Sequence, residues 1–356
     1  MKKIVKITAF LLAFALVLWA AQRILMPKYV SEAQDGRLIG EYYDSSMDHD
    51  VLFIGDCEVY ENISPVTLWQ DYGITSYVRG SPQQLIWHSY YLMEETLKHE
   101  KPEAFVFNVL SMKYGEPQSE AYNRLALDGM RWSSSKVQSV RAAMTEEEDF
   151  LSYVFPLLRF HSRWSELKWE DVRYAFGGVP QLSVNGYLMR IDVDGVEALR
   201  TGRPLMDYTL PQICWDYLEK MRLLCEENGV ELILMKAPTS TPQWTWYDEW
   251  DAQMESYAQE HGLAYYNFLE DVDAIGLDFM TDTYDQGGHL NLSGAEKLSR
   301  YFGKILREDH GIAGHAGDPV IEDRWQIIAD QYEQIRQTQE KLLKENGKLT
   351  GFTGIQ

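Results

Sequence analysis

The sequence predicts an α/β fold in which a central parallel sheet lies between two layers of helices. Short, continuously apolar runs alternate along the chain with longer segments that carry apolar residues at helical spacing. Strands that alternate with helices in this way form parallel sheets whose two faces are both covered. Apolar residues make up 45% and aromatic residues 13% of the 356 residues, which is enough for a large core. In such sheets, ligands bind at the carboxyl ends of the strands.

The predicted elements follow one another in a regular order after the first 50 residues. The first strand, VLFIG at residues 51–55, is expected to be buried because it is apolar throughout. The other predicted strands are residues 75–80, 103–110, 231–238 and 264–268. The predicted helices are residues 64–72, 83–100, 211–228, 244–262 and 292–308. Each strand is therefore followed, directly or after an insertion, by a helix.

An apolar segment at the N-terminus predicts a membrane anchor. Three lysines occur among the first six residues and precede the apolar run at residues 7–21. Positive charge before an apolar run places the N-terminus in the cytoplasm and the remainder outside it. We expect residues 1–27 to be an uncleaved single-pass anchor, because Leu18 and Trp19, three residues before the candidate cleavage sites, are bulky. A cleaved signal peptide followed by secretion is the alternative.

The rest of the chain is expected to form one domain with additions. Residues 28–50 are polar and are interpreted as a stalk and lead-in helix, and residues 51–312 as the α/β domain. Residues 113–208, rich in Trp, Arg and Ser, depart from the alternation and predict a mostly helical insertion that caps the active end of the sheet. Residues 313–356 predict a helical tail with a solvated surface, or alternatively a partner-binding or coiled-coil helix.

The net charge, the motifs and the cysteine spacing exclude several classes of function. The formal net charge of -21 argues against nucleic acid, whose phosphates attract Lys and Arg. No spacing typical of metal ligands, phosphate-binding loops or nucleotide fingerprints occurs, so we expect no metal and no cofactor. Cys214 and Cys225 lie in one predicted helix, about 16 Å apart, too far for a disulfide. Cys57 therefore has no evident disulfide partner.

Cys57 is the first candidate for chemistry. It follows Gly55 and Asp56 directly after the first strand, where a turn leads towards a helix. A nucleophile at that position projects into the crevice, and the nearby helix N-terminus favours a thiolate and a developing oxyanion. His289, on a Gly-rich loop, is the candidate general base, with Asp282 and Asp285 just upstream to orient it. The alternative is a loop whose histidine only packs.

These blocks together resemble the SGNH (also called GDSL) hydrolase family. The family places Gly-Asp-Ser after the first strand, and this chain has Gly-Asp-Cys there, at residues 55–57. The family has a Gly after the second strand and an Asn after the third, which correspond to Gly80 and Asn108. Its last block is Asp-x-x-His near the C-terminus, whose His corresponds to His289. The resemblance implies a flavodoxin-like three-layer sandwich. It also implies an oxyanion hole formed by the N–H groups of Cys57 and Gly80 and the side chain of Asn108.

The chain departs from the family pattern at two points. Cys57 replaces the serine, which is compatible with acyl-thioester chemistry but also with a degenerate site whose thiol only packs. Gln286 stands three residues before His289, where the family has Asp, and Asp285 stands four before. We expect Asp285 to orient His289. Asp282, or a dyad without any carboxylate, are the alternatives.

The overall layout is similar to membrane-anchored cell-envelope members of this superfamily, such as the D-alanine-transfer protein of the lipoteichoic-acid pathway and the alginate O-acetylation proteins. This resemblance implies an extracytoplasmic acyltransferase or esterase that acts on O-acyl groups of a cell-envelope glycan or teichoic-acid-like acceptor. It also implies a membrane-bound acyltransferase as partner. The alternative is a catalytically inactive surface protein that keeps the fold for binding or assembly.

Other residues are weaker candidates for substrate binding. Asp56 is expected to hold the turn before Cys57 by hydrogen bonds. Lys236, at the end of the fourth predicted strand, is placed to bind an anionic group, or is simply solvated there. Arg159, His161 and Arg163 form a basic-aromatic cluster in the insertion. For this cluster a plain helix face is favoured over substrate binding.

Overall fold

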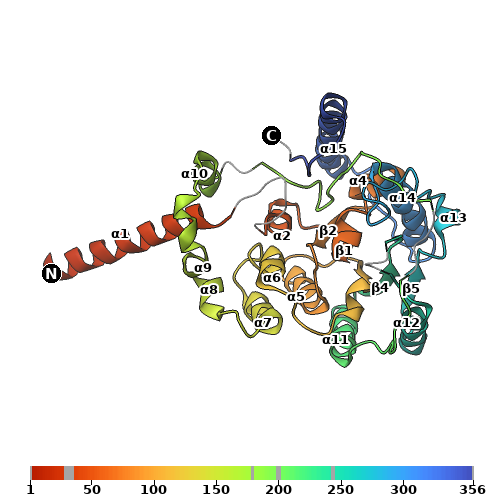
Figure 1. Ribbon diagram of the computed structural model, residues 1–356, viewed down its shortest axis with the longest axis horizontal. Helices are drawn as coiled ribbons and strands as arrows, with labels where there is room; N and C mark the ends of the chain where they lie inside the picture. The colour runs from red at the N-terminus through yellow and green to blue at the C-terminus, as the bar shows by residue number, and fades with distance from the viewer. Residues whose placement is uncertain (1, 28–35, 178–179, 198–201, 242–244, 355–356) are drawn as a thin grey trace.

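The computed structural model describes residues 2–27, 36–177, 180–197, 202–241 and 245–354. In this part of the chain one sheet of five parallel strands forms the centre of the molecule, in the order β2-β1-β3-β4-β5 (Figure 1). The strands are β1 (Val51–Gly55), β2 (Ser76–Gly80), β3 (Ala104–Asn108), β4 (Glu231–Lys236) and β5 (Ala264–Asn267). This is the flavodoxin-like order, and the predicted three-layer α/β fold is confirmed.

Helices cover both faces of the sheet, because successive strand residues point to opposite sides. In β1, Leu52 and Ile54 join one apolar cluster, and Val51 and Phe53 join the other. The first cluster is covered by α5 (Ile86–Thr96), α11 (Gln212–Asn228) and α12 (Asp248–His261). The second is covered by α4 (Pro65–Tyr72), α14 (Leu292–Glu308) and α15 (Pro319–Asn346).

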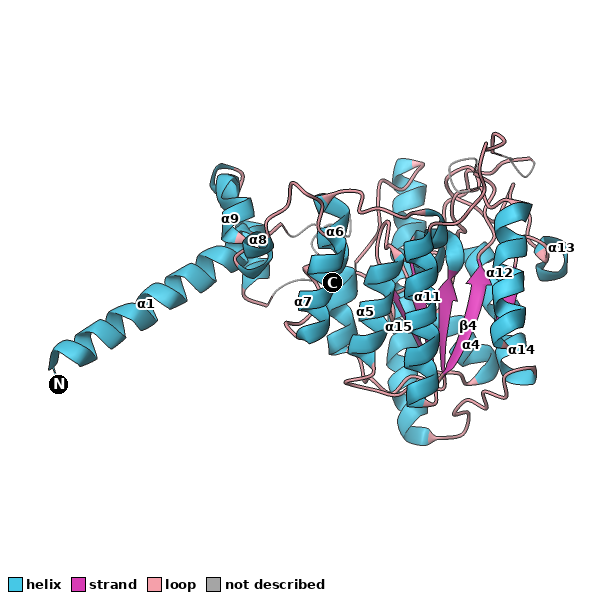
Figure 2. Cartoon of the chain, turned by 90° about the horizontal axis from the view of Figure 1, so that it is seen from below, coloured by secondary structure: helices cyan, strands magenta, loops and turns pink. Residues whose placement is uncertain are grey.

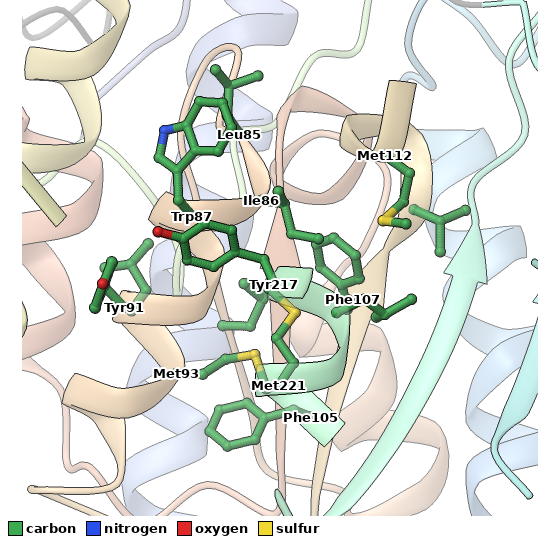
Figure 3. Packing of buried hydrophobic residues seen from close by; sticks show 14 of the residues in the cluster. Leu85, Ile86, Trp87, Tyr91, Met93, Phe105, Phe107, Met112, Tyr217 and Met221 are labelled. Carbon is green, nitrogen blue, oxygen red and sulfur yellow. The ribbon is translucent and has the colours of Figure 1, made fainter. Parts of the chain in front are cut away.

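The first cluster is rich in aromatic and sulfur-containing side chains. Figure 3 shows side chains of α5 and α11 meeting above β3, with Trp87 and Tyr217 on one side and Phe105 on the other. The rings of Trp87 and Tyr217 lie 6.2 Å apart at an interplanar angle of 58°. Trp87 and Phe105 have no exposed surface. Such large rings account for much of the apolar area that the core removes from water.

The segments before and after the α/β core also contribute to it. Within the predicted lead-in, α2 (Arg37–Gly40) and η1 (Glu41–Asp44) bury Ile39 and Tyr42 completely, while residues 28–35 lie outside the described residues. The tail helix α15 was expected to have a solvated surface, but one face of it is buried at Trp325, Tyr332, Ile335 and Gln339. These residues are seven, three and four positions apart, which places them on one face of the helix, and that face packs against α4.

Directly after β3, η2 (Val109–Lys113) leads into the insertion, which forms short helices. They are α6 (Glu120–Leu127), α7 (Ser134–Ala143), α8 (Phe150–Val154), α9 (Leu157–Phe160), η3 (His161–Ser165) and α10 (Trp169–Ala175). The expectation that these helices cap the active end is wrong. Helix α7 packs against α5, and α9 and α10 pack against the N-terminal helix (Figures 1 and 2). Among the described residues of the insertion, its later part reaches the carboxyl edge of the sheet. The backbone N–H of Leu188 donates to the backbone oxygen of Tyr60 in the nucleophile turn, and residues 190–194 form backbone hydrogen bonds with Thr283, Gln286 and Leu292.

The N-terminal helix α1 (Lys2–Leu25) extends away from the sheet (Figure 2). Among the described residues it is the one helix long and apolar enough to cross a membrane, with a mean hydropathy of 2.3 over its most apolar window. None of that window is buried inside the protein. Its length and composition therefore match the predicted anchor.

Phe53 provides a test of the core. It is fully buried, and its ring lies 5.9 Å from that of Phe302 in α14. We expect Phe53→Ala to reduce the free energy of unfolding by about 3–5 kcal/mol, because a large ring is lost and a cavity remains. Denaturant unfolding of the detergent-solubilised full chain measures this. Val320→Ala, at a side chain that is 74% exposed, is the control and should change stability by less than about 0.5 kcal/mol. Equal losses for the two variants would contradict the assignment of this core.

Candidate active site

Cys57 lies where β1 meets the short helix α3 (Cys57–Tyr60). Asp56 is the N-cap of that helix, and its Oδ1 accepts a hydrogen bond from the backbone N–H of Glu58 at 3.1 Å. The turn needs Gly55, because a Cβ there would lie 2.5 Å from the side chain of Val59 and 3.0 Å from that of Asn108. The sharp turn thus brings Cys57 to the carboxyl edge of the sheet, where it stays partly exposed.

His289 is held by Asp285 through both carboxylate oxygens. Asp285 Oδ2 lies 2.7 Å from His289 Nδ1, and Oδ1 accepts a hydrogen bond from the backbone N–H of His289 at 2.7 Å. Gln286 and Gly287 adopt positive φ angles of 61° and 88°, which turn the loop back and place Asp285 beside the ring. Asp282 instead accepts from Lys297 Nζ at 2.7 Å. Of the two candidate carboxylates, Asp285 is the one in contact with His289.

Cys57 and His289 meet at this edge. Their side chains lie close enough for each to shift the pKa of the other. Because Nδ1 of His289 binds Asp285, Nε2 is the nitrogen left to face other groups. Glu61 Oε1 lies 3.7 Å from that Nε2, and Glu61 also accepts a hydrogen bond from the hydroxyl of Tyr284. The Tyr284 ring stacks on His289 with centroids 5.9 Å apart, so the imidazole is constrained on several sides.

The environment sets the protonation states of these groups. Burial raises the pKa of the Cys57 thiol to about 12, although the charge of His289 acts in the opposite direction. Burial also disfavours the charged form of His289, but Glu61, Cys57 and Asp285 outweigh it and hold its pKa well above the ordinary value. Burial thus favours the neutral thiol at Cys57, and the carboxylates of Glu61 and Asp285 favour the imidazolium at His289. His289 becomes able to accept a proton only as the pH rises.

A buried polar network lies under the nucleophile turn. Lys236 Nζ contacts the two carboxylate oxygens of Glu58 at 2.9 and 2.8 Å, and both side chains are fully buried. Asn108 Nδ2 donates to Asp56 Oδ1 at 3.2 Å and to Glu58 Oε2 at 3.1 Å. Burial, together with the charge of Glu58, raises the pKa of Asp56 to about 7. Burial lowers the pKa of the neighbouring Lys113 to about 8.

The structure shows where three candidate residues from the sequence lie at this edge. Lys236 is paired with Glu58 inside the protein, where the sequence suggested a group that faces the crevice or solvent. The amide of Asn108 donates to two carboxylates, and its Oδ1 accepts from the backbone N–H of Ala237 at 3.2 Å. Gly80 lies opposite Gly55 at the ends of the paired strands β1 and β2, at the same edge as Cys57.

The basic cluster of the insertion lies elsewhere. Arg163 Nη1 donates to the backbone oxygen of Leu25, and Arg159 Nε donates to Glu120 at 2.9 Å. His161 Nδ1 contacts the backbone oxygen of Leu158 at 3.1 Å. These residues belong to α9 and η3, which pack against α1, and the structure does not bring them to Cys57.

Three residues of the site were not found from the sequence. Glu58 and Glu61 follow Cys57 by one and four positions in the segment CEVYE, and Tyr284 directly precedes Asp285. Four residues is one helical turn, so the position of Glu61 on the same side as Cys57 was a usable signal. The partner of Glu58 was not visible, because Lys236 is 178 positions away in the chain.

Comparisons with known proteins give only distant likenesses. No protein-family model matches the chain, and no curated protein matches it. Solved structures similar to it include a protein described as lipolytic, of the G-D-S-L family, from Desulfitobacterium hafniense, with 14% identity over 73% of this chain and 100% of that chain and a TM-score of 0.38. They also include the lipase/acylhydrolase from Enterococcus faecalis (10% identity, 73% of this chain and 95% of that chain, TM-score 0.36). A GDSL-like lipase from Bacteroides thetaiotaomicron is another (12% identity, 78% of this chain and 100% of that chain, TM-score 0.36). At these identities and scores the chemistry must be argued from the residues of this chain.

Removal of Lys236 tests the buried network. We expect Lys236→Met to lower the free energy of unfolding by about 3–5 kcal/mol at neutral pH, because the carboxylate of Glu58 loses its buried partner. Chemical denaturation of the full chain measures this. The double variant Glu58→Gln with Lys236→Met removes both charges and should recover part of the loss.

The control is Lys304→Met, which removes a lysine that is 62% exposed and lies 3.8 Å from Glu308. It should cost no more than about 1 kcal/mol. A Lys236→Met protein as stable as this control would show that the pair does not hold the turn in place.

Proposed function

We propose that this chain is a membrane-anchored, extracytoplasmic acyl-transfer enzyme that forms a thioester on Cys57. The observation that supports it best is the arrangement of Cys57, His289 and Asp285, with Asp285 bonded at 2.7 Å to the far nitrogen of the imidazole. A nucleophile, a base and a group that orients the base, in that order, are the parts that nucleophilic acyl transfer needs.

In the first half-reaction, the Cys57 sulfur forms a bond to the acyl carbon and the C–O bond of the ester breaks. The thiol proton passes to His289 Nε2 and then to the leaving oxygen. In the second half-reaction, an acceptor hydroxyl or water loses its proton to His289 and attacks the thioester carbon. The sulfur leaves as a thiolate and takes that proton back. Asp285 stabilises the imidazolium that forms in each half-reaction.

The oxyanion of each tetrahedral intermediate needs hydrogen-bond donors at the same edge. The backbone N–H groups of Cys57 and Gly80 are the proposed donors. Asn108 is the third proposed donor, although its amide is bonded to Asp56 and Glu58 in the resting site. It would have to turn away from one of these carboxylates when substrate binds. Protonation of Asp56, whose pKa is raised to about 7, would ease that release.

The proposed substrates are O-acyl groups of a cell-envelope polymer. Helix α1 supports a location at the membrane. The lysines before it support an α/β domain outside the cytoplasm, and a membrane-bound acyltransferase is the proposed partner. The net charge of -21 fits a neutral glycan better than a phosphate-rich teichoic acid, because like charges repel at long range.

A second function is favoured by the state of the resting site. The Cys57 thiol is held protonated by burial, and the Asn108 amide is already occupied by carboxylates. Both features fit a catalytically inactive protein that keeps the fold for binding or for assembly of an envelope-modifying complex. The next experiment separates these two functions.

Acyl transfer to Cys57 can be measured directly. The full chain in detergent is incubated with p-nitrophenyl acetate at mildly alkaline pH, and intact mass and peptide mapping locate the acetyl group. We expect one acetyl thioester, on Cys57, which hydroxylamine removes. His289→Ala should slow its formation on the order of 10²–10⁴-fold, because the general base is lost.

Two cysteine variants provide the control. Cys57→Ala should abolish labelling, whereas Cys225→Ala, which changes a buried thiol on α11, should leave it unchanged. If the wild-type protein acquires no acetyl group on Cys57, or if Cys57→Ala labels equally, the enzyme function is wrong and the inactive binding protein is favoured.

The pH dependence of acetylation follows from the charges around His289. Because only neutral imidazole accepts a proton, the rate should rise with pH and reach half its maximum well above the ordinary histidine pKa of about 6.5. Glu61→Gln removes a carboxylate that favours the imidazolium, so the midpoint should move down by about one pH unit or more. Acetylation rates of the full chain across pH measure both.

Glu345→Gln, at an exposed carboxylate of α15, is the control and should leave the midpoint in place. A wild-type midpoint at or below the ordinary histidine value, or an upward shift in Glu61→Gln, would disprove this account of His289.

A further inference from the structure

Exposed apolar side chains concentrate in one stretch of the insertion, residues 150–176, here called the α8–α10 segment. Its large exposed apolar residues are Leu151 (53%), Phe155 (54%), Leu158 (54%), Trp164 (73%), Trp169 (74%) and Phe176 (56%). Single apolar residues on a surface are ordinary, but a concentration of this kind indicates an interaction surface. The proposed acyl-transfer site does not use these residues.

The α8–α10 segment is bonded to the C-terminal end of α1. Arg163 Nη1 donates to the backbone oxygen of Leu25 at 2.5 Å, and Arg23 Nε donates to the backbone oxygen of Ala175 at 2.6 Å. Figures 1 and 2 both show α9 beside the end of α1, and α9 and α10 contact that helix. The segment is therefore fixed at the point where α1 reaches the globular part.

The length of α1 sets the depth at which this contact occurs. Its 24 residues span about 36 Å, whereas the hydrocarbon core of a bilayer is about 30 Å thick. With the N-terminal lysines at the cytoplasmic surface, the outer boundary of the hydrocarbon falls in the last turns of α1, near Trp19 and Arg23. The rings of Trp19 and Phe176 lie 6.2 Å apart, so the α8–α10 segment reaches the same depth.

The charge of the segment also differs from that of the chain. It contains four basic residues (Arg159, Arg163, Lys168, Arg173) and three acidic ones (Glu166, Glu170, Asp171), which gives a net charge of +1 within a chain of -21. The remaining residues would be repelled by an anionic lipid surface, and this segment would not. Exposed Trp side chains beside Arg and Lys are the residue types that settle at the boundary between acyl chains and headgroups.

We propose that the α8–α10 segment is a membrane-surface element that lies in the outer headgroup region of the bilayer crossed by α1. Trp164 and Trp169 occupy the boundary with the acyl chains, and the exposed side chains of Lys168 and Arg173 contact lipid phosphates. The proposal rests on α1 spanning the membrane and is independent of any acyl-transfer activity. It gives the insertion a role in holding the domain against the membrane by a second attachment.

Quenching by lipids tests the proposal on the full chain. The protein is reconstituted into phosphatidylcholine–phosphatidylglycerol vesicles whose acyl chains are brominated near the headgroup, and tryptophan emission is compared with that in unbrominated vesicles. We expect the double variant Trp164→Phe with Trp169→Phe to lose about two-thirds of the quenched emission, because two of the three tryptophans placed at the bilayer are removed. Trp19 supplies the remainder.

Trp215→Phe is the matched control, since Trp215 lies on α11 with its ring 5.3 Å from that of Tyr257. It should leave the quenched emission unchanged. If Trp19 is still quenched but the double variant matches the wild type, the segment is not at the lipid and the proposal is wrong. If the protein does not float with the vesicles, α1 does not span them and the proposal also falls.

A partner protein over the same surface would give a different result. A benzophenone amino acid at position 164 would then form a protein adduct in native membranes, while the brominated lipids would quench neither Trp164 nor Trp169 in vesicles. That pair of results would replace the lipid surface with a protein partner. Lipid adducts in native membranes, together with quenching in vesicles, would support the membrane-surface element.

Discussion

The buried ion pair between Glu58 and Lys236 is the interaction on which the geometry of the site depends. Glu58 belongs to the helical turn that begins at Cys57, and Lys236 is the last residue of β4. Asn108, at the end of β3, bridges Glu58 and Asp56. The ends of β1, β3 and β4 are thereby tied together by charge and hydrogen bonds beneath the nucleophile. Two charges without water are stable there only because each is the partner of the other, so the turn has little freedom to move.

Much of this arrangement could be predicted from local sequence patterns. The continuous apolar strands and their alternation with helices were sufficient for the sheet and its layers, and the residues at the strand ends followed from them. The Glu58–Lys236 pair could not be predicted, because a lysine after an apolar strand is usually solvated and its partner is remote in the chain. The sequence favoured Asp285 over Asp282, and Asp285 is the residue that contacts His289, because the left-handed backbone at Gln286 and Gly287 places it beside the ring.

The position of the insertion is a part of the fold that the sequence did not predict. The sequence shows that the insertion is rich in Trp, Arg and Ser. It does not show which part of the fold the insertion packs against, because short helices of this kind contain few apolar residues that specify a partner. Contacts with α1, such as that of Arg163 with the carbonyl of Leu25, decide where the segment lies. Helix α1 leaves its last carbonyl groups without partners inside the helix, and a guanidinium group satisfies one of them. The positions of α9, η3 and α10 were thus decided by the end of another helix and not by the sheet.

The sulfur of Cys57 has an energetic consequence for any acyl group that it carries. A thioester lies above an oxygen ester in free energy, because sulfur donates less electron density to the carbonyl than oxygen does. An acyl group on Cys57 would therefore pass downhill to a hydroxyl, whereas loading Cys57 from an oxygen ester would be uphill. A donor that is itself a thioester, or another activated acyl compound, would transfer its acyl group to Cys57 with little change in free energy. Because Cys57 is regenerated in each cycle, the replacement of oxygen by sulfur changes the free energy of the intermediate and not the equilibrium between donor and acceptor.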